Sequence, residues 1–231
     1  LVGMNPVIIH GGGPQIGKEL SKAGLESEFI GGLRVTTKSV MSVVKKILGT
    51  QINHEIVRLI KHFGGNAISF NHNKYSIIRA TKRNNDEGPD LGYVGKVEKI
   101  LTGEIKKKID NGFIPVIAPI GKSKNNDYWN INADVVAGEV AQSLKAEKLI
   151  LLTDVKGIGD SENKLISKIS LKKGQKVLKE KFIKGGMTPK LTSALEAKKN
   201  GVKSCHIIDG RVPHAVLLEV LTEEGVGTMI S

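Results

Sequence analysis

The feature that most constrains this chain is the alternation of short apolar runs with longer segments of helical periodicity. Such alternation is typical of a mostly parallel sheet covered by helices. Strands are expected at residues 7–9, 67–70, 113–119, 148–153 and 202–208, and the last, 227–230, could lie antiparallel at an edge. Two β segments, 75–80 and 93–100, flank the polar loop 83–92 and predict a hairpin beside the main sheet. Helices are expected at 38–62, 102–111, 133–146, 188–200 and 213–222.

Three of these helices begin at residues that can cap them. Thr37 precedes the helix at 38–62, and Thr102 is expected to cap the helix that Gly112 ends. Asn130 or Asn132 can cap the helix that starts near residue 133. The segment 121–129 is polar, contains glycine and is expected to be unstructured, so a domain boundary, if there is one, falls there.

Composition excludes several classes of protein. The chain has 231 residues, of which 39% are hydrophobic and 25% charged, as in globular proteins. No apolar run approaches the ~20 residues that cross a bilayer, so no membrane association is expected. The single cysteine, Cys205, excludes an internal disulfide and a cysteine-based zinc cluster. Its simplest role is that of a small core residue, and a reducing, cytoplasmic location is expected.

The formal net charge of +12 raises the question of nucleic-acid binding. Against it, the lysines are spread along the chain, aromatic residues make up only 4%, and no helix-turn-helix, zinc-finger or RNP-like segment occurs. A basic protein also suits small polyanions such as ATP or a dicarboxylate. Charge alone therefore leaves open both a nucleic-acid ligand and a small polyanion, and nucleic acid is the weaker alternative.

Residues 6–19, PVIIHGGGPQIGKE, form a Gly-rich turn between a strand and a helix. From Gly12 they read G-x-x-x-x-G-K, but Glu19 stands where a P-loop has Ser or Thr, and Ile16 breaks the dinucleotide-binding pattern. Three glycines and a helix N-terminus nevertheless favour an anion close to the backbone. The alternative is a tight turn that binds nothing.

Three further polar clusters follow expected strands or open helices, where ligands of open α/β sheets bind. They are N130-I-N132-A-D134, T153-D154-V155-K156-G157 and G185-G186-M187-T188-P189-K190. Lys190 opposes the dipole of its helix, which a bound anion would offset. Arg34, in a stretch expected to be irregular, could grip a carboxylate in bidentate fashion. The alternatives are that Asn132 only caps its helix and that Arg34 is an ordinary surface arginine.

No catalytic Ser/His/Asp order and no metal-ligand cluster is present in the sequence. Positive charge and backbone N–H groups around a crevice, with one well-placed aspartate, suit phosphoryl transfer.

Blocks along the whole chain resemble those of the acetylglutamate kinases, within the amino acid kinase family. They are HGGGPQI, GLRVT, DLGYVGKV, NINADVVAGEVA, LILLTDVKGI, GGMTPKL and IIDGRVPHAVLLEVLTEEGVGTMI. The resemblance implies an α/β fold, an open αβα sandwich with a mostly parallel central sheet. It implies an acceptor half at 1–120 and an ATP half at 121–231, and transfer of the ATP γ-phosphoryl group to the γ-carboxylate of N-acetyl-L-glutamate in arginine biosynthesis.

The resemblance also implies roles for individual residues. Gly12 and Gly13 would present N–H groups to the acceptor side and the phosphoryl group, and Arg34 with Asn130 would hold the α-carboxylate. Lys190 would neutralise charge on the phosphoryl group during its transfer, and Asp134 would orient this lysine. Mg²⁺ would be held mainly by the phosphates. The residues implied in ATP binding are Thr153, Asp154, Gly157, Gly186 and Met187.

Two further expectations come from the resemblance. Family members begin with a strand and a K-x-G-G turn that carries a second catalytic lysine, so this chain is expected to be N-terminally truncated and poorly active alone. Its C-terminal block resembles the arginine-inhibited branch, which implies an arginine site at His206, Glu219 and Gly225 and a homo-oligomer, dimer or hexamer. The alternatives are an amino acid kinase with another acceptor and a catalytically silent, basic nucleotide- or nucleic-acid-binding module.

Overall fold

The computed structural model describes residues 3–84, 88–222 and 225–231. The chain forms two compact units, Leu1–Val136 and Ala137–Ser231. The sequence predicts halves at 1–120 and 121–231. The two divisions differ in residues 121–136, which belong to the first unit and include the start of the helix at Ala133–Leu144. Residues 85–87 of the expected polar loop lie outside the described part.

The first unit is built on a parallel sheet of three short strands. Its order is β1–β7–β4, with β1 at Ile8–Ile9, β7 at Ile114–Ile117 and β4 at Ala67–Phe70. A parallel sheet is covered on both faces, which explains why these strands are almost continuously apolar. The strands predicted at 7–9, 67–70 and 113–119 are thereby confirmed. The Gly-rich turn follows the carboxyl end of β1, and helix α1 (Gly13–Lys22) starts within it.

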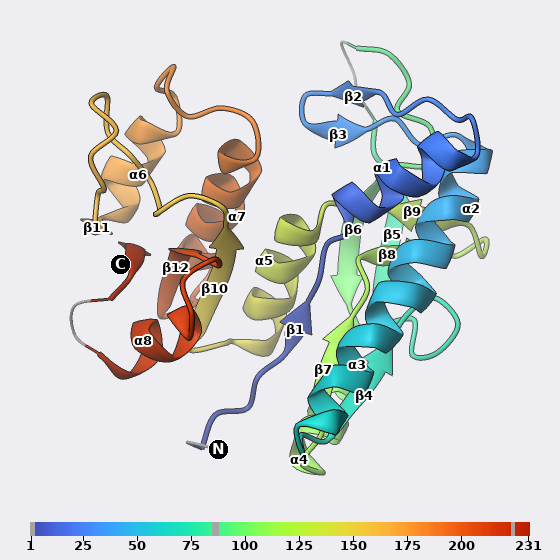
Figure 1. Ribbon diagram of the computed structural model, residues 1–231, viewed down its shortest axis with the longest axis horizontal. Coiled ribbons are helices and arrows are strands. Elements are labelled where there is room, and N and C mark those ends of the chain that lie inside the picture. The colour runs from blue at the N-terminus through green and yellow to red at the C-terminus, as the bar shows by residue number, and fades with distance from the viewer. Residues whose placement is uncertain (1–2, 85–87, 223–224) are drawn as a thin grey trace. The chain divides into compact units, whose positions relative to one another are not determined.

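A long helical rod lies along this sheet (Figure 1). The helix predicted at 38–62 is confirmed, but it consists of α2 (Lys38–Lys46), a π-helical segment η1 (Ile47–Ile52) and α3 (Asn53–His62). Thr37 caps α2, because its hydroxyl accepts a hydrogen bond from the Val40 N–H at 3.3 Å. Wide π turns are rare and disturb the 3.6-residue period locally.

A second sheet of the first unit has the order β6–β5–β8–β9. The predicted hairpin is present as β5 (Ile78–Lys82) and β6 (Gly95–Ile100), which pair antiparallel. The segment expected to be unstructured is instead the hairpin of β8 (Ile120–Lys122) and β9 (Tyr128–Asn130). This prediction was wrong because strands of three residues depend on their partner rather than on a local pattern.

Two more local predictions in the first unit were wrong. The stretch around Arg34 is ordered, since β2 (Phe29–Ile30) and β3 (Leu33–Arg34) form an antiparallel hairpin. Helix α4 (Thr102–Asp110) contains Thr102 as its first residue rather than its cap, and Leu101 at the cap position makes no side-chain bond. Helix α5 (Ala133–Leu144) is capped by Asn132, whose side-chain oxygen accepts from the N–H groups of Asp134 and Val135.

The second unit has one four-stranded sheet, in the order β10–β12–β13–β11. The strands are β10 (Lys148–Thr153), β12 (Ser204–Asp209), β13 (Gly227–Ile230) and β11 (Lys168–Ile169). The first two are parallel, and β13 runs antiparallel to β12, as predicted. However, β13 is no edge strand, because the unpredicted β11 pairs with its other side.

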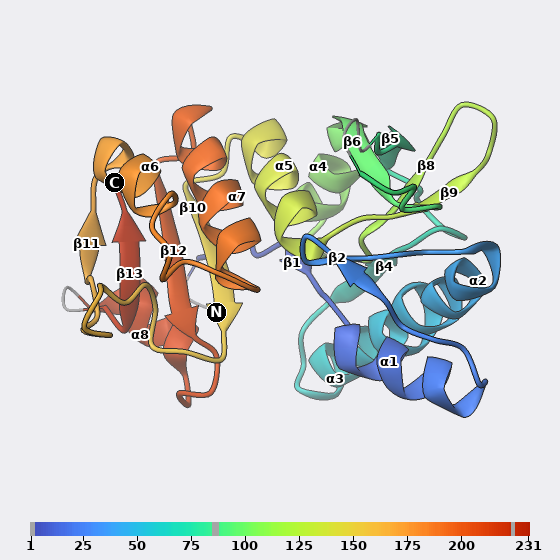
Figure 2. The same ribbon diagram turned by 90° about the horizontal axis from the view of Figure 1, so that it is seen from above.

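Helices cover both faces of this sheet (Figure 2). They are α6 (Leu171–Val177), α7 (Met187–Lys199) and α8 (Ala215–Leu221). Neighbouring residues of a strand point to opposite faces. His206 of β12 forms a hydrogen bond with Glu219 of α8. Lys198 of α7 acts on the pKa of the neighbouring Cys205 thiol. The two helices α7 and α8 therefore lie on opposite faces of the sheet. In the described part of the chain no helix is both long and apolar enough to cross a bilayer.

We expect Cys205 to be chemically inert in the folded protein. Its side chain is fully buried, and burial raises the pKa of the thiol to about 12. The thiolate is the reactive form, so iodoacetamide at mildly alkaline pH should leave the native protein unlabelled and label it fully in denaturing guanidinium. Mass spectrometry reads both states from this one cysteine. Rapid labelling of the native protein would contradict the packing of β12 against α7.

Candidate functional site

The Gly-rich turn and Arg34 lie together in the first unit. The Arg34 guanidinium donates from Nη2 to the carbonyl oxygen of Gly13 at 3.1 Å, although 21 positions separate them. At Gly12, a Cβ atom would lie 2.4 Å from Ile52 Cδ1 and 2.6 Å from Leu48 Cδ2, so a side chain does not fit there. The structure thus brings the predicted Gly12, Gly13 and Arg34 into one place.

The backbone N–H groups of this turn point away from protein acceptors. The Gly12 carbonyl accepts from the Ile16 N–H at 2.9 Å and so opens α1, which directs the Gly13 N–H off the helix start. Within the described residues neither Gly12 N–H nor Gly13 N–H donates to the protein. Two such donors at the positive end of a helix are suited to an anion.

Arg34 is held in a largely buried position. Only 8% of it is exposed, its Nη1 donates to the Ser27 hydroxyl, and the guanidinium lies 4.5 Å from the centre of the Phe29 ring. Burial lowers the pKa of Arg34, but the side chain remains charged because an arginine titrates far above neutrality. A buried cation without a carboxylate partner among the described residues is suited to an anionic ligand.

Asn130 is linked to Arg34 through one intermediate residue. Its side-chain amide donates to the Thr36 hydroxyl at 3.1 Å, and that hydroxyl donates to the Arg34 carbonyl at 2.8 Å. Thr36 is fully buried, so this connection is protected from water. Asp134, two residues beyond the capping Asn132, lies in the first turn of α5.

Glu19, which would repel phosphate in a P-loop, belongs to a surface ion pair. Its carboxylate lies 2.5 Å from Lys46 Nζ, and this lysine lowers the pKa of Glu19.

In the second unit, polar groups gather at the carboxyl ends of β10 and β12. Thr153 and Asp209 are register partners, and Asp154 follows Thr153 in the next turn. Gly157 adopts a φ of 145°, and a Cβ there would lie 2.8 Å from the Thr228 hydroxyl. Ligands of open α/β sheets bind beyond the carboxyl ends of parallel strands, so this edge of the unit is suited to a ligand.

Asp209 and Arg211 form a salt bridge at this edge that sequence reasoning missed. Arg211 donates to both carboxylate oxygens, from Nε at 2.9 Å and from Nη2 at 2.8 Å. These bonds hold the pKa of Asp209 at about 2. The acid and the arginine two positions later in D-G-R were the available signal.

The start of α7 contains the remaining predicted nucleotide residues. Gly186 is the residue before the helix, Met187 is its first residue and Lys190 lies in its first turn. At Gly186 a Cβ would meet no atom within 4 Å, so the backbone there is open to a ligand.

His206, Glu219 and Gly225 also come together. His206 Nδ1 lies 2.5 Å from Glu219 Oε1, and both side chains are 4% exposed. The other oxygen of Glu219 accepts from the Val226 N–H at 2.6 Å, and a Cβ on Gly225 would lie 3.1 Å from it. The Glu219 carboxylate is therefore already bound within the protein.

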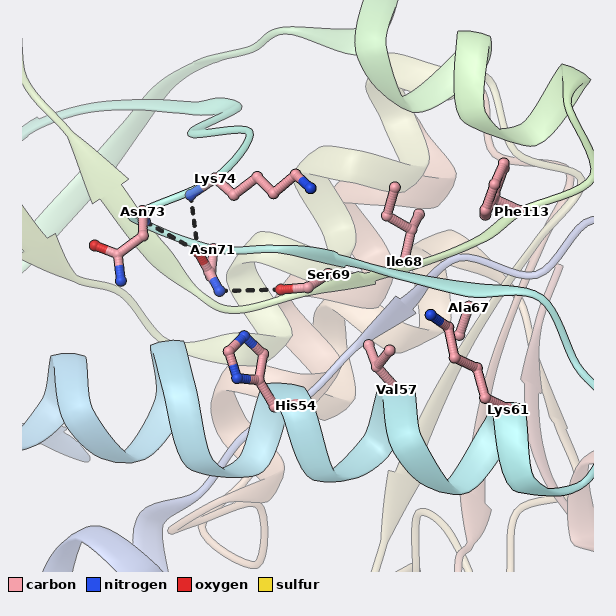
Figure 3. Close-up of a pocket in the computed structure, with 10 residues that line it drawn as sticks. All are labelled: His54, Val57, Lys61, Ala67, Ile68, Ser69, Asn71, Asn73, Lys74 and Phe113. Carbon is pink, nitrogen blue, oxygen red and sulfur yellow. Dashed lines mark hydrogen bonds between the residues drawn. The ribbon is translucent and has the colours of Figure 1, made fainter.

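A pocket of about 390 Å³ lies elsewhere in the first unit, between α3 and β4 (Figure 3). It is lined by His54, Val57, Lys61, Ala67, Ile68, Ser69, Asn71, Asn73, Lys74 and Phe113. None of the predicted site residues lines this pocket, so the pocket is separate from the predicted site residues. Across the described residues, no group of three His, Cys, Asp or Glu side chains could hold a metal ion.

Comparison of the sequence with known protein families agrees with the observed fold. The profile of the amino acid kinase family matches residues 1–209, and the chain belongs to this family. Acetylglutamate kinase of Ruthia magnifica subsp. Calyptogena magnifica is 51% identical, over all of this chain and 80% of that protein. Acetylglutamate kinase of Hydrogenovibrio crunogenus is 48% identical with the same coverage.

A solved structure is similar over nearly the whole chain. It is N-acetylglutamate synthase from Neisseria gonorrhoeae, complexed with coenzyme A and N-acetyl-glutamate. The TM-score is 0.87 at 25% identity, over 97% of this chain and 51% of the synthase chain. The predicted α/β fold of the amino acid kinases is confirmed.

Proposed function

We propose that this chain is an ATP-dependent phosphotransferase that phosphorylates N-acetyl-L-glutamate in arginine biosynthesis. An oxygen of the γ-carboxylate attacks the γ-phosphorus of ATP and forms an acyl phosphate. The bond from that phosphorus to the β,γ-bridging oxygen breaks, and ADP leaves with the electron pair. The attacking carboxylate is ionised at neutral pH, so no proton has to be removed.

The similarity to acetylglutamate kinases, over all of this chain and 80% of each relative, carries this proposal, and the contact of Arg34 with the Gly-rich turn supports it. A guanidinium has five N–H donors, of which Ser27 and Gly13 use two, so three remain for a ligand carboxylate. Arg34 would bind the α-carboxylate, with Asn130 beside it. The N–H groups of Gly12 and Gly13 would donate to the acceptor side and the phosphoryl oxygens.

The residues of the second unit would bind ATP. Gly186 would offer its backbone N–H group at the start of α7, Met187 would contact the nucleotide beside it, and Lys190 would neutralise the phosphoryl charge. Asp134 would have an orienting role in catalysis. Thr153, Asp154 and Gly157 would contact the nucleotide at the end of β10. Mg²⁺ usually binds to substrate phosphates rather than to an all-protein cage, and would reach the site on the phosphates of ATP.

The direct test is ATP-dependent formation of the acyl phosphate from N-acetyl-L-glutamate by the complete gene product, trapped as the hydroxamate. Glutamate, aspartate and carbamate serve as alternative acceptors. Hydroxamate from N-acetyl-L-glutamate alone is the expected result. Binding of ATP without this product would reject the acceptor.

Exchange of Arg34 for lysine should raise the KM for N-acetyl-L-glutamate by roughly 10- to 100-fold and leave the KM for ATP unchanged. Lysine keeps the charge but loses the planar fork, and a hydrogen bond to a charged group contributes about 1.5–3 kcal/mol. Steady-state kinetics with each substrate varied in turn gives both constants. Arg58→Lys, at an exposed position of α3, is the matched control. Equal KM values in the two variants would remove Arg34 from the site.

Arginine is proposed as a regulatory ligand at His206, Glu219 and Gly225. Its guanidinium would have to compete with the bonds that Glu219 already makes inside the unit. A homo-oligomer, dimer or hexamer, is likewise proposed. Isothermal titration with L-arginine and sedimentation analysis test the two proposals separately.

A further inference from the structure

A chain of buried and partly buried hydrogen bonds ends at the Gly-rich turn. Asn71 Nδ2 donates to the Ser69 hydroxyl at 3.0 Å, and this hydroxyl donates to Asn53 Oδ1. Asn53 Nδ2 contacts His10 Nε2 at 3.1 Å, and His10 Nδ1 contacts the Gly11 carbonyl oxygen at 3.1 Å. Figure 3 shows the outer end of this chain, where Asn71 and Ser69 line the pocket. Its inner end lies beside Gly12.

The direction of every bond in this chain is determined by chemistry. Asn53 Nδ2 also lies 3.0 Å from the Val116 carbonyl oxygen, and a carbonyl only accepts, so this atom is the amide nitrogen. Its second hydrogen then points to His10 Nε2, which must accept. Neutral imidazole carries one proton, so His10 holds it on Nδ1 and donates to Gly11.

Burial keeps His10 in this neutral form. The residue is 7% exposed, and desolvation lowers the pKa of its imidazole. Asn53 is fully buried, so the bond between them does not exchange with water. A single tautomer is therefore locked in place before any ligand binds.

The bond to the Gly11 carbonyl determines the direction of the next N–H group. The peptide unit between Gly11 and Gly12 is planar and trans, so its carbonyl and its N–H point in opposite directions. When His10 holds the oxygen on one side, the Gly12 N–H is directed to the other side. This N–H group is one of the two free donors of the turn.

Asn53 lies directly after the π-helical segment η1, as the first residue of α3, and is fully buried. Two side chains of η1, Leu48 and Ile52, fill the space where a Cβ of Gly12 would lie. The helical segment around Asn53 therefore packs against the Gly-rich turn.

We propose that His10 and Asn53 are positioning residues for the phosphoryl-transfer site, and that the Nδ1–H tautomer of His10, imposed by Asn53, aims the Gly12 N–H at the acyl acceptor. The inference rests on the proposed function, because it takes the ligand of the turn to be N-acetyl-L-glutamate. Neither side chain touches the substrate.

The first experiment reads the tautomer directly in the wild-type protein. Histidine-selective ¹⁵N labelling and long-range ¹⁵N–¹H correlation distinguish a protonated Nδ1 from a protonated Nε2, and His10→Gln assigns the signals. We expect the Nδ1–H form in the ligand-free protein at neutral pH. Protonated Nε2 would overturn the proposal, whether or not the protein binds N-acetyl-L-glutamate.

The second experiment compares two amides at position 10. An asparagine amide can reach the position of Nδ1 and a glutamine amide that of Nε2, so His10→Asn can retain the bond to Gly11 and His10→Gln cannot. We expect the Kd for N-acetyl-L-glutamate to rise roughly 5- to 100-fold in His10→Gln, on the scale of one lost orienting hydrogen bond, and much less in His10→Asn. The Kd for ATP should stay constant.

The outcomes separate this inference from the proposed function. If wild type does not bind N-acetyl-L-glutamate, the proposed function fails, and the tautomer still tests the hydrogen-bond chain. Equal affinities of wild type and His10→Gln would overturn the positioning role. If the position-10 variants do not fold, Asn53→Asp decides. A carboxylate facing Nε2 draws the proton there, and the ¹⁵N spectrum should change accordingly.

Discussion

Replacement of Lys190 by methionine is expected to lower kcat by roughly 10²- to 10³-fold, the scale on which one electrostatic contact to a transition state acts. The lysine lies in the first turn of α7, where the helix dipole opposes a positive charge by a few tenths to one kcal/mol. An anion bound beside this ammonium group would offset that cost. In phosphoryl transfer, negative charge shifts toward the β,γ-bridging oxygen, which such a cation stabilises.

The controls for Lys190 separate charge from helix stability. Lys199→Met removes an exposed lysine from the last turn of the same helix and should leave kcat within about twofold. Lys190→Arg keeps the charge and should restore only part of the rate, because the guanidinium distributes it differently. Steady-state kinetics at saturating ATP and acceptor measures all three. A wild-type kcat for Lys190→Met would mean that the lysine is not catalytic.

The longer elements could be predicted from the sequence. The helix at 38–62 has both a cap at Thr37 and a sustained apolar period, and β10 is a continuous apolar run. Helix α6 (Leu171–Val177) was missed, and so were the strands β2, β3, β8, β9 and β11, which have two or three residues each. At this length pairing with a distant strand decides the conformation, and no local pattern reports it. The π-helical segment η1 was missed as well.

The parts of the candidate site that neighbouring residues form could be predicted from the sequence, whereas contacts between residues far apart in the sequence could not. The clusters after β1 and β10 could be read because ligands bind beyond the carboxyl ends of parallel strands. The bond from Arg34 to Gly13 spans 21 positions and the contact between His10 and Asn53 spans 43. Only the tertiary structure brings these pairs together. Asp209 was missed although its partner Arg211 is two residues away, because an acid beside an arginine is common on surfaces.

Removal of the Glu219 side chain is expected to destabilise the protein by about 3–5 kcal/mol. The carboxylate binds His206 and the Val226 N–H in a site where both side chains are 4% exposed. Glu219→Ala would leave the buried His206 donor and the partly buried Val226 N–H without acceptors, and breaking a buried pair on one side costs about this much. Because this residue joins α8 to β12 and to the residue just before β13, the loss should lower the stability of the second unit as a whole.

The matched control is an exposed pair of nearly the same length. Glu147 and Lys203 are 2.7 Å apart, but 78% and 74% of their side chains are exposed. Solvent screens such a pair, so Glu147→Ala should cost less than about 1 kcal/mol. Urea unfolding followed by circular dichroism gives both values. Equal effects would mean that Glu219 is not buried in solution. A large difference would mean that any arginine bound there has to displace a structural contact, so that regulation and stability depend on the same carboxylate.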